Sequence, residues 1–274
     1  MPSNYGPGPG TARCRSSSTF RREAKPTVSI VVPCFNEAES IPTLIERLRL
    51  LVEAQPGWDV LFINDGSKDA TAELLDAAAA RFAWARVYHQ PRNLGLGAGV
   101  RTGLLNTESA FVCTIDSDGS YPPERLPEFI ELLRKGADIV TASPWHPDSD
   151  QAEGGIHRLM LSRGVSWCYR IVTGVHLYTF TALFRAYRRE VVDAVNFENN
   201  GFPAVTELLI RALAKGYKVA EVPMPLIPRE RGQSKMSLTQ AIRGHLSLVA
   251  STPGWMRSER QKSLHPSQCP PPGL

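Results

Sequence analysis

The chain lacks most of the features that mark a membrane-spanning, secreted or disulfide-bonded protein. Its five cysteines are odd in number, widely spaced and without a C-x-x-C pair, so we expect neither a disulfide framework nor a zinc site. There is no run of about 18 apolar residues that could span a bilayer. The first 25 residues contain no apolar core of a secretory signal. These absences predict a cytoplasmic protein with reduced cysteines.

Excess positive charge is absent from the body of the chain. The formal net charge is +4 at pH 7, and five cations and one acid in residues 1–25 account for all of it. The rest of the chain is neutral and offers no basic surface to a nucleic acid, so we expect no such partner. With 42% hydrophobic and 21% charged residues, the composition is that of a globular protein.

Motifs of several large enzyme classes are also missing. The glycines of GLGAG (95–99) follow the third predicted strand and lack the third glycine of a dinucleotide fingerprint, which argues against a dehydrogenase. They are expected to allow a helix or a ligand to approach the backbone closely. The sequence contains no G-x-S-x-G, Walker A or H-x-E motif, which excludes most hydrolases and NTPases.

What the sequence does contain is a repeated alternation of strands and helices. Short apolar, strand-like runs occur at 28–32, 59–63, 86–89, 111–115 and 138–142, with segments of helical periodicity between them. Strands joined by helices predict right-handed βαβ units and a Rossmann-like, mostly parallel sheet with helices on both faces. We expect one α/β domain over residues 27–250. Residues 1–26 are predicted to be a disordered basic tail, and 251–274 a Pro-rich disordered tail.

Acidic residues gather in the loops that end three of these strands. They lie in the segments 33–37, 64–69 and 116–119, and parallel sheets of this class bind ligands at the carboxyl ends of their strands. Asp116 and Asp118 are two residues apart in an extended segment and point to the same side. Two adjacent carboxylates need a proton or a cation between them. The pair predicts Mg²⁺ or Mn²⁺ completed by ligand phosphates; the alternative is a surface turn at Gly119.

Four strand-end motifs and three later segments carry a resemblance to a known family. The motifs are VSIVVPCFNEAESIPTLIERL, VLFINDGSKDAT, RNLGLGAGVRTGL and TIDSDGSYPPERLPEFIELL. In order and spacing they resemble family 2 glycosyltransferases, so the resemblance implies a single GT-A domain. The segments SRGVSWCYRIV, FRAYRREVV and EVPMPLIPRERGQSKMS resemble the branch of dolichyl-phosphate mannosyltransferase and other polyprenyl-phosphate glycosyltransferases.

This resemblance implies a role for each matching residue. The donor's base and ribose would be held by Pro33, Phe35, Glu37, Ile63 and Asp65. Asp116 and Ser117 would contact the donor sugar or ribose, and Arg229 and Lys235 would contact phosphate. Asp118 would bind the metal, with Ser120 at the position of the family's usual glutamine. An arginine that the family carries after the fifth strand is absent, and Arg158 or Arg163 is its expected substitute.

The function implied is a metal-dependent, inverting transfer of a mannose- or glucose-type sugar from a GDP- or UDP-linked donor to a polyprenyl phosphate. An acceptor phosphate is already ionised, so no strong general base is needed. If the acceptor is instead a hydroxyl of a polysaccharide or natural product, a carboxylate must take its proton, and Glu207 is the candidate. A second alternative is a non-catalytic sugar-nucleotide binder, which would need neither Asp118 nor the basic segment.

A lipid acceptor also requires contact with a membrane surface. Leu238, Ile242, Leu246 and Val249 recur at helical spacing and predict one apolar helix face, with Arg243 and His245 away from its centre. Such a face indicates peripheral binding to the cytoplasmic side of a membrane. The alternative is that the face packs against the sheet.

Overall fold

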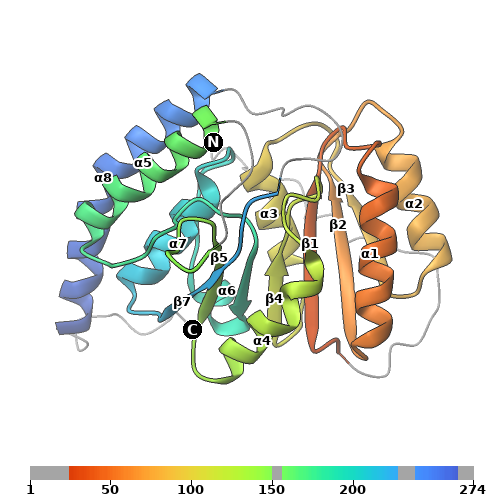
Figure 1. The fold of residues 1–274 in the computed structure, drawn as a ribbon, viewed down its shortest axis with the longest axis horizontal. Helices are drawn as coiled ribbons and strands as arrows, with labels where there is room; N and C mark the ends of the chain where they lie inside the picture. Colours follow the sequence, from red (N-terminus) through yellow and green to blue (C-terminus); the bar gives the residue numbers. More distant parts are fainter. Residues whose placement is uncertain (1–24, 150–155, 228–237, 265–274) are drawn as a thin grey trace, which may run out of the picture.

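A sheet forms the centre of the protein in the computed structural model, which describes residues 25–149, 156–227 and 238–264. Within those residues the sheet has seven strands (Figure 1). They are β1 (Val28–Cys34), β2 (Trp58–Asn64), β3 (Ala85–His89), β4 (Phe111–Thr114), β5 (Ile139–Ser143), β6 (Arg185–Arg188) and β7 (Val219–Pro223). Their order is β3-β2-β1-β4-β6-β5-β7. Only β6 is antiparallel to its neighbours in the described sheet, which confirms the predicted mostly parallel arrangement.

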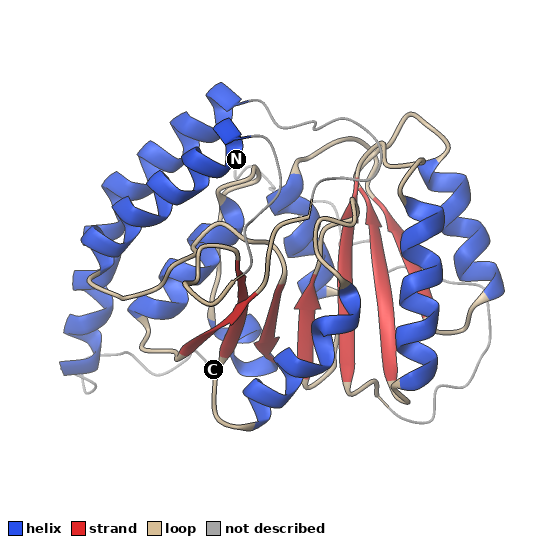
Figure 2. Cartoon of the chain, in the orientation of Figure 1, coloured by secondary structure: helices blue, strands red, loops and turns tan. Residues whose placement is uncertain are grey.

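Helices cover both faces of this sheet, as the alternation predicts (Figure 2). In the described part of the chain they are α1 (Ile41–Ala54), α2 (Thr71–Arg81), α3 (Leu96–Leu105), α4 (Leu126–Arg134), α5 (Ile156–Thr173), α6 (Arg189–Ala194), α7 (Ala204–Ala214) and α8 (Leu238–Leu264). A short 3-10 turn, η1 (Pro123–Arg125), precedes α4.

The strands are buried on both sides because each face has its own core. Val28, Ile30 and Val32 of β1 pack with apolar residues of α1, α2 and α4. Val31 of β1 and Leu61 of β2 point to the opposite face and pack with residues of α3 and α7. Alternate side chains of a strand therefore fill two cores, which explains why the central strands are mostly apolar. The buried polar side chains of Ser29 and Asp59 are bonded to each other across β1 and β2 at 2.6 Å.

Hydrophobic periodicity alone does not predict the position or the antiparallel direction of strand β6 in the sheet. This strand lies between β4 and β5, and its Arg185 is fully buried. The guanidinium donates to the carbonyl oxygens of Val205 and Phe180 and to Thr141 Oγ1. A buried cation is tolerated when its donors are satisfied in this way, and here the bonds tie β6 to β5 and to α7.

Helices α5 and α8 pack side by side at one end of the molecule (Figure 1). Helix α8 passes residue 250 without a break, and Thr252 and Met256 are buried, so the packed structure continues beyond the boundary expected from sequence. The residues of both predicted tails that fall in 1–24 and 265–274 lie outside the described residues. Among the described helices, none combines the length and apolarity needed to cross a bilayer.

The strand order determines where a site can form. From β1 the chain builds β2 and β3 on one side, and β4 lies on the other side of β1. The carboxyl ends of β1 and β4 therefore flank the point where the strand order reverses, and open α/β sheets hold their ligands at such a point.

Candidate active site at the carboxyl edge of the sheet

The loops that follow β1 and β2 are bonded to each other. Asn36 adopts a left-handed backbone conformation (φ 52°), and its backbone N–H donates to Ser67 Oγ at 3.0 Å. Its side-chain oxygen accepts from the backbone N–H of Lys68 at 2.7 Å. Glu37 is buried, and its backbone N–H donates to Thr71 Oγ1 at 2.9 Å. These bonds fix the two loops before any ligand binds.

Asp65 follows β2 and is held by two backbone hydrogen bonds. One oxygen accepts from the backbone N–H of Leu94 at 2.7 Å, and the other accepts from that of Gly95 at 2.9 Å. Burial raises the pKa of Asp65, and the two backbone bonds oppose that rise. The residue therefore holds the turn before α3 as well as facing the site, a second task that sequence reasoning did not identify.

Two other residues of the implied donor set lie beneath this surface. Pro33 and Ile63 are buried, and both lie next to the position that a side chain at Gly99 would occupy, with Pro33 Cβ at 3.4 Å and Ile63 Cγ2 at 3.8 Å. Phe35 is half-buried in the β1 loop. Pro33 and Ile63 thus pack against α3 at the ends of β1 and β2, next to the loops that carry Glu37 and Asp65.

The D-x-D segment after β4 forms a compact turn at the same edge. Asp116 is half-buried, whereas Ser117, Asp118 and Ser120 are buried. The backbone N–H of Ser120 donates to Asp118 Oδ1 at 2.9 Å, and Gly119 has a φ of +75°. A glycine allows this left-handed conformation without strain. The bond orients the Asp118 carboxylate.

Two buried groups next to this turn have raised pKa values. Burial raises the pKa of the Tyr121 hydroxyl, and the charges of Asp116 and Asp118 raise it further. Burial also raises the pKa of the Cys34 thiol, with a further contribution from Glu37. Both groups stay protonated at neutral pH, so Cys34 does not supply a thiolate nucleophile.

The donor set at this edge consists of oxygen atoms. Asp116, Asp118 and the Ser120 hydroxyl are the hard ligands that Mg²⁺ and Mn²⁺ prefer. Among the described residues, no group of three or more His, Cys, Asp and Glu side chains is arranged to hold a metal ion. A hollow between α1 and this turn is lined by Glu39, Ser40, Thr43, Leu44, Arg47, Asp118 and Gly119.

Of the basic residues expected at the site, only Arg163 has a described side chain. Arg229 and Lys235 lie outside the described residues, as does the side chain of Arg158. The chain enters that segment directly beside the D-x-D turn, because the backbone N–H of Ile227 donates to the Ser120 carbonyl oxygen at 3.0 Å. Arg163 is exposed on α5.

The glycines before and within α3 are required by close packing, as the sequence predicts. A Cβ at Gly97 would lie 2.3 Å from the Asn199 carbonyl oxygen, and one at Gly95 would lie 2.4 Å from that of Asn200. Gly95 also has a φ of +97°. The loop of residues 195–203, between α6 and α7, therefore contacts the turn that Asp65 holds.

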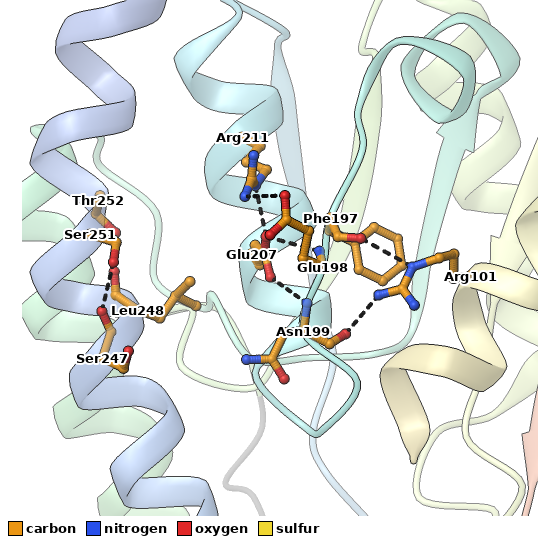
Figure 3. Close-up of polar contacts among 10 residues, drawn as sticks. All are labelled: Arg101, Phe197, Glu198, Asn199, Glu207, Arg211, Ser247, Leu248, Ser251 and Thr252. Carbon is orange, nitrogen blue, oxygen red and sulfur yellow. Dashed lines mark hydrogen bonds and ion pairs between the residues drawn. The ribbon is translucent and has the colours of Figure 1, made fainter. Parts of the chain in front are cut away.

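Glu207 of α7 is engaged in structural bonds (Figure 3). Its buried carboxylate accepts from the backbone N–H groups of Glu198 and Asn199 at 3.1 and 3.0 Å. Arg211 Nε donates to the same carboxylate at 2.8 Å. The carboxylate is thus occupied by backbone and side-chain donors of the protein itself, an engagement that a free general base for an acceptor hydroxyl would not have.

The apolar face expected on α8 is divided in the structure. Ile242 and Leu246 are exposed, and Leu246 has 64% of its surface accessible. His245, expected away from the centre of that face, is buried on another side of the helix, with Nδ1 at 3.1 Å from the Tyr169 hydroxyl. The packed side of α8 includes Ala241, His245 and Leu248. Leu238 begins the helix, and its side chain is not among those that the structure describes.

Comparison with known proteins agrees with this architecture. The family model described as "Glycosyl transferase family 2" matches residues 29–195. An undecaprenyl-phosphate mannosyltransferase of Micrococcus luteus is 36% identical over 217 residues, which cover 77% of this chain and 87% of that protein. A polyprenol monophosphomannose synthase of Mycolicibacterium smegmatis is 33% identical over 215 residues, which cover 76% of this chain and 80% of that protein.

A solved structure resembles the whole described domain. It is glucosyl-3-phosphoglycerate synthase from Mycobacterium tuberculosis in complex with Mn²⁺, UDP and glucosyl-3-phosphoglycerate. The two share 21% sequence identity, with a TM-score of 0.63 over 84% of this chain and 80% of that one. At this identity the likeness concerns the fold, which is the GT-A arrangement expected from the sequence motifs.

Proposed function

Because the chain belongs to glycosyl transferase family 2, we propose that it transfers a sugar from a nucleotide-diphosphate donor to a polyprenyl phosphate. Membership of the family makes the protein a glycosyltransferase. The observation that carries the proposal is that the loops with Glu37, Asp65, Asp116 and Asp118 follow the neighbouring strands β1, β2 and β4 at the carboxyl edge of the sheet. The names of the Micrococcus luteus and Mycolicibacterium smegmatis relatives favour a polyprenyl-phosphate acceptor and a mannosyl donor.

In this proposal the loops after β1 and β2 hold the nucleoside. Glu37 and Asp65 are carboxylates that can accept hydrogen bonds from the base and the ribose, and Phe35 offers an apolar surface beside them. Pro33 and Ile63 support these loops from below. Asp116 and Ser117 then face the ribose or the donor sugar. Both GDP and UDP donors are compatible with these groups.

A divalent cation fits the oxygen ligands of the D-x-D turn. Asp118 would hold it, with Ser120 and the donor diphosphate completing the coordination. The structural relatives crystallised with Mn²⁺ or Mg²⁺ and UDP support this assignment. When bound, the cation would neutralise charge that develops on the diphosphate. The bond from Ser120 N–H to Asp118 keeps that carboxylate oriented in advance.

The remaining chemistry is a displacement at the anomeric carbon. The bond from this carbon to the diphosphate oxygen breaks, and its electron pair stays on the nucleoside diphosphate. An oxygen of the acceptor phosphate forms the new bond from the opposite face, which inverts the configuration. A phosphate monoester is ionised at neutral pH, so no proton has to be removed, in keeping with the engaged state of Glu207.

Arg229 and Lys235 are proposed to stabilise the two phosphate groups. Both residues belong to the segment that follows Ile227 in the chain, and the backbone N–H of Ile227 donates to the Ser120 carbonyl oxygen beside the proposed metal site. Fixed cations that face a developing negative charge lower the barrier of such a transfer.

The face formed by α5 and α8 is proposed to rest on a membrane. Trp167 and Ile171 of α5 are 62% and 61% exposed, and Ile242 and Leu246 of α8 are exposed on the neighbouring helix. Helix α5 contains no acidic residue, and α8 contains only Glu259 among several arginines. Exposed apolar residues on helices with excess positive charge suit the surface of an anionic bilayer.

Product analysis tests the transfer directly. Incubation with GDP-mannose, UDP-glucose or related donors and undecaprenyl phosphate should give a glycosyl phosphate lipid detectable by mass spectrometry. Release of nucleoside diphosphate without a lipid product, but with glycosylation of a hydroxyl acceptor, would support the alternative glycosyltransferase. Donor binding without turnover on any acceptor would identify a sugar-nucleotide binder.

Liposome flotation tests the membrane contact. The protein should float with anionic liposomes, less so at high salt, and Leu246→Glu should weaken binding. Leu50→Glu is the matched control, because Leu50 is 56% exposed on α1, which covers the opposite face of the sheet. Equal binding by the two variants would show that the α5–α8 face does not contact lipid.

A further inference from the structure

The carboxylate of Glu207 determines the shape of the neighbouring loop. Glu207 is buried in α7, and it binds the backbone N–H groups of Glu198 and Asn199 in the 195–203 loop (Figure 3). A carboxylate that accepts two adjacent backbone N–H bonds fixes the backbone at that point, because a charged acceptor forms stronger hydrogen bonds than a neutral one. The Glu207 side chain therefore holds the loop backbone and is not exposed to solvent.

The loop in turn contacts the turn held by Asp65. The Asn200 carbonyl oxygen accepts from the backbone N–H of Gly97 at 2.7 Å. Arg101 of α3 reinforces this contact, since it donates to the carbonyl oxygens of Phe197 and Asn199 (Figure 3). It also donates to the side-chain oxygen of Asn200. The loop thus lies against residues 94–97, whose N–H groups at 94 and 95 bind Asp65.

Glu207 and the 195–203 loop are also linked to α8. Arg211 donates to Glu207, and its guanidinium lies 4.2 Å from the centre of the Trp255 ring. A cation over an aromatic face is favourable and is held in place by the ring. Pro203 at the end of the loop packs against α8, because a Cβ at Gly244 would lie 2.5 Å from Pro203 Cγ.

From these contacts we propose that Glu207 is a positioning residue for the donor. It fixes the 195–203 loop against the 94–97 turn, and the loop keeps Asp65 in the orientation that binds the nucleotide. Trp255 supports it through Arg211. This inference rests on the proposed function, since it concerns the same donor site. It assigns Glu207 to donor affinity and not to proton transfer.

The substitution Glu207→Gln separates these roles. Glutamine has one side-chain oxygen instead of two. Its NH₂ group would therefore face a backbone N–H of Glu198 or Asn199, and one of the two hydrogen bonds to the loop would be lost. We expect KM for the donor and Kd for the nucleoside diphosphate, measured by calorimetry, to rise about tenfold, with kcat within about threefold of wild type and the pH profile of kcat unchanged. Glu190→Gln, which removes the same charge from an exposed residue of α6, should change none of these values.

A contrary result would be equally clear. A fall in kcat of about 10²–10⁴-fold with unchanged donor KM, together with loss of the acidic limb of the pH profile, would identify Glu207 as a general base and overturn the proposal. Unchanged KM and Kd would overturn it as well. If Glu207→Gln does not fold, Trp255→Leu serves as the second variant, with a smaller rise in donor KM in the same direction.

Amide hydrogen exchange gives a readout that needs no donor. In Glu207→Gln, residues 195–203 and 94–97 should exchange faster than in wild type, while β2 and α1 keep their protection. Unchanged exchange at 94–97 would refute the link between the loop and the turn, even if the wild-type protein bound no nucleotide sugar. Failure of the proposed function is thereby separated from failure of this inference.

Discussion

Two parts of the proposed donor site are held together in different ways. After β1 and β2, loop residues bond directly to other loops, as Asn36 does to Ser67 and Asp65 does to Leu94. Between α3 and α7, helix side chains hold the 195–203 loop, chiefly Glu207 of α7 and Arg101 of α3. The nucleotide side is therefore held by bonds between loops, whereas the other side depends on how helices pack.

The largest effect is expected at Asp118, in the turn that follows β4. We expect Asp118→Ala to lower turnover by about 10²–10³-fold, the typical cost of losing one preorganised electrostatic partner, with an unchanged melting temperature. The measurement is nucleoside diphosphate release with Mn²⁺ or Mg²⁺. Asp193→Ala, an exposed acid of α6, is the control. Near wild-type turnover in a chelating buffer would exclude the metal assignment.

The contact between the two sides can be tested at Gly97. In Gly97→Ala the new Cβ would meet both the Asn199 carbonyl oxygen and Ala204 Cβ, at 2.3 and 2.4 Å, so the loop and α3 must separate. Overpacking of this kind costs about 1–3 kcal/mol, and we expect the upper part of that range in chemical denaturation.

The matched control is Gly164→Ala in α5, where the added methyl group would meet nothing within 4 Å. Because alanine is the better helix former, this variant should be more stable than wild type by about 0.5–1 kcal/mol. Equal destabilisation of both variants would mean that the 195–203 loop does not press on α3.

The same division explains how much could be predicted from the sequence. The parallel strands and the acidic loops follow from hydrophobic periodicity and from motifs such as D-x-D, because each depends on residues close together in the chain. The antiparallel pairing of β6 depends on partners far apart in sequence, such as Arg185 with Thr141. The bonds of Glu207 join residues near it in the chain, but they depend on the irregular conformation of the 195–203 loop. Periodicity predicts neither kind of contact. Periodicity placed His245 away from the centre of the apolar face of α8, but it did not reveal that this other side of the helix is buried, with His245 bonded to Tyr169.

His245 provides a smaller, pH-dependent test of the helix-packed side. Burial lowers its pKa to about 4 from the ordinary 6.5. The unfolded chain therefore takes up the proton first as the pH falls, so stability is full above pH 6.5 and is lost between pH 6.5 and 4. At pH 5 this amounts to about 2 kcal/mol. Denaturation of His245→Asn should lack this loss.

Tyr169→Phe is the informative companion to His245→Asn. It removes the hydroxyl beside the ring but leaves His245 buried, so its acid-induced loss of stability should remain. If Tyr169→Phe instead abolishes the loss, the hydrogen bond and not burial controls the titration. Parallel stability curves for wild type and His245→Asn between pH 7 and 5 would mean that His245 is accessible to protons in the folded protein.

The smallest effect is expected at Lys235, which belongs to the basic segment beyond β7. A hydrogen bond to a charged group contributes about 1.5–3 kcal/mol, and the lower end applies to a cation that water can partly replace. Lys235→Ala should therefore slow transfer about tenfold. Lys25→Ala is the control, because Lys25 forms a surface ion pair with Glu108 at 3.0 Å and such pairs contribute little. A low-salt assay sharpens the difference, since screening by salt weakens the attraction between a cation and a diphosphate. Equal, small effects from the two substitutions would remove Lys235 from the site and leave Arg229 as the remaining proposed phosphate contact.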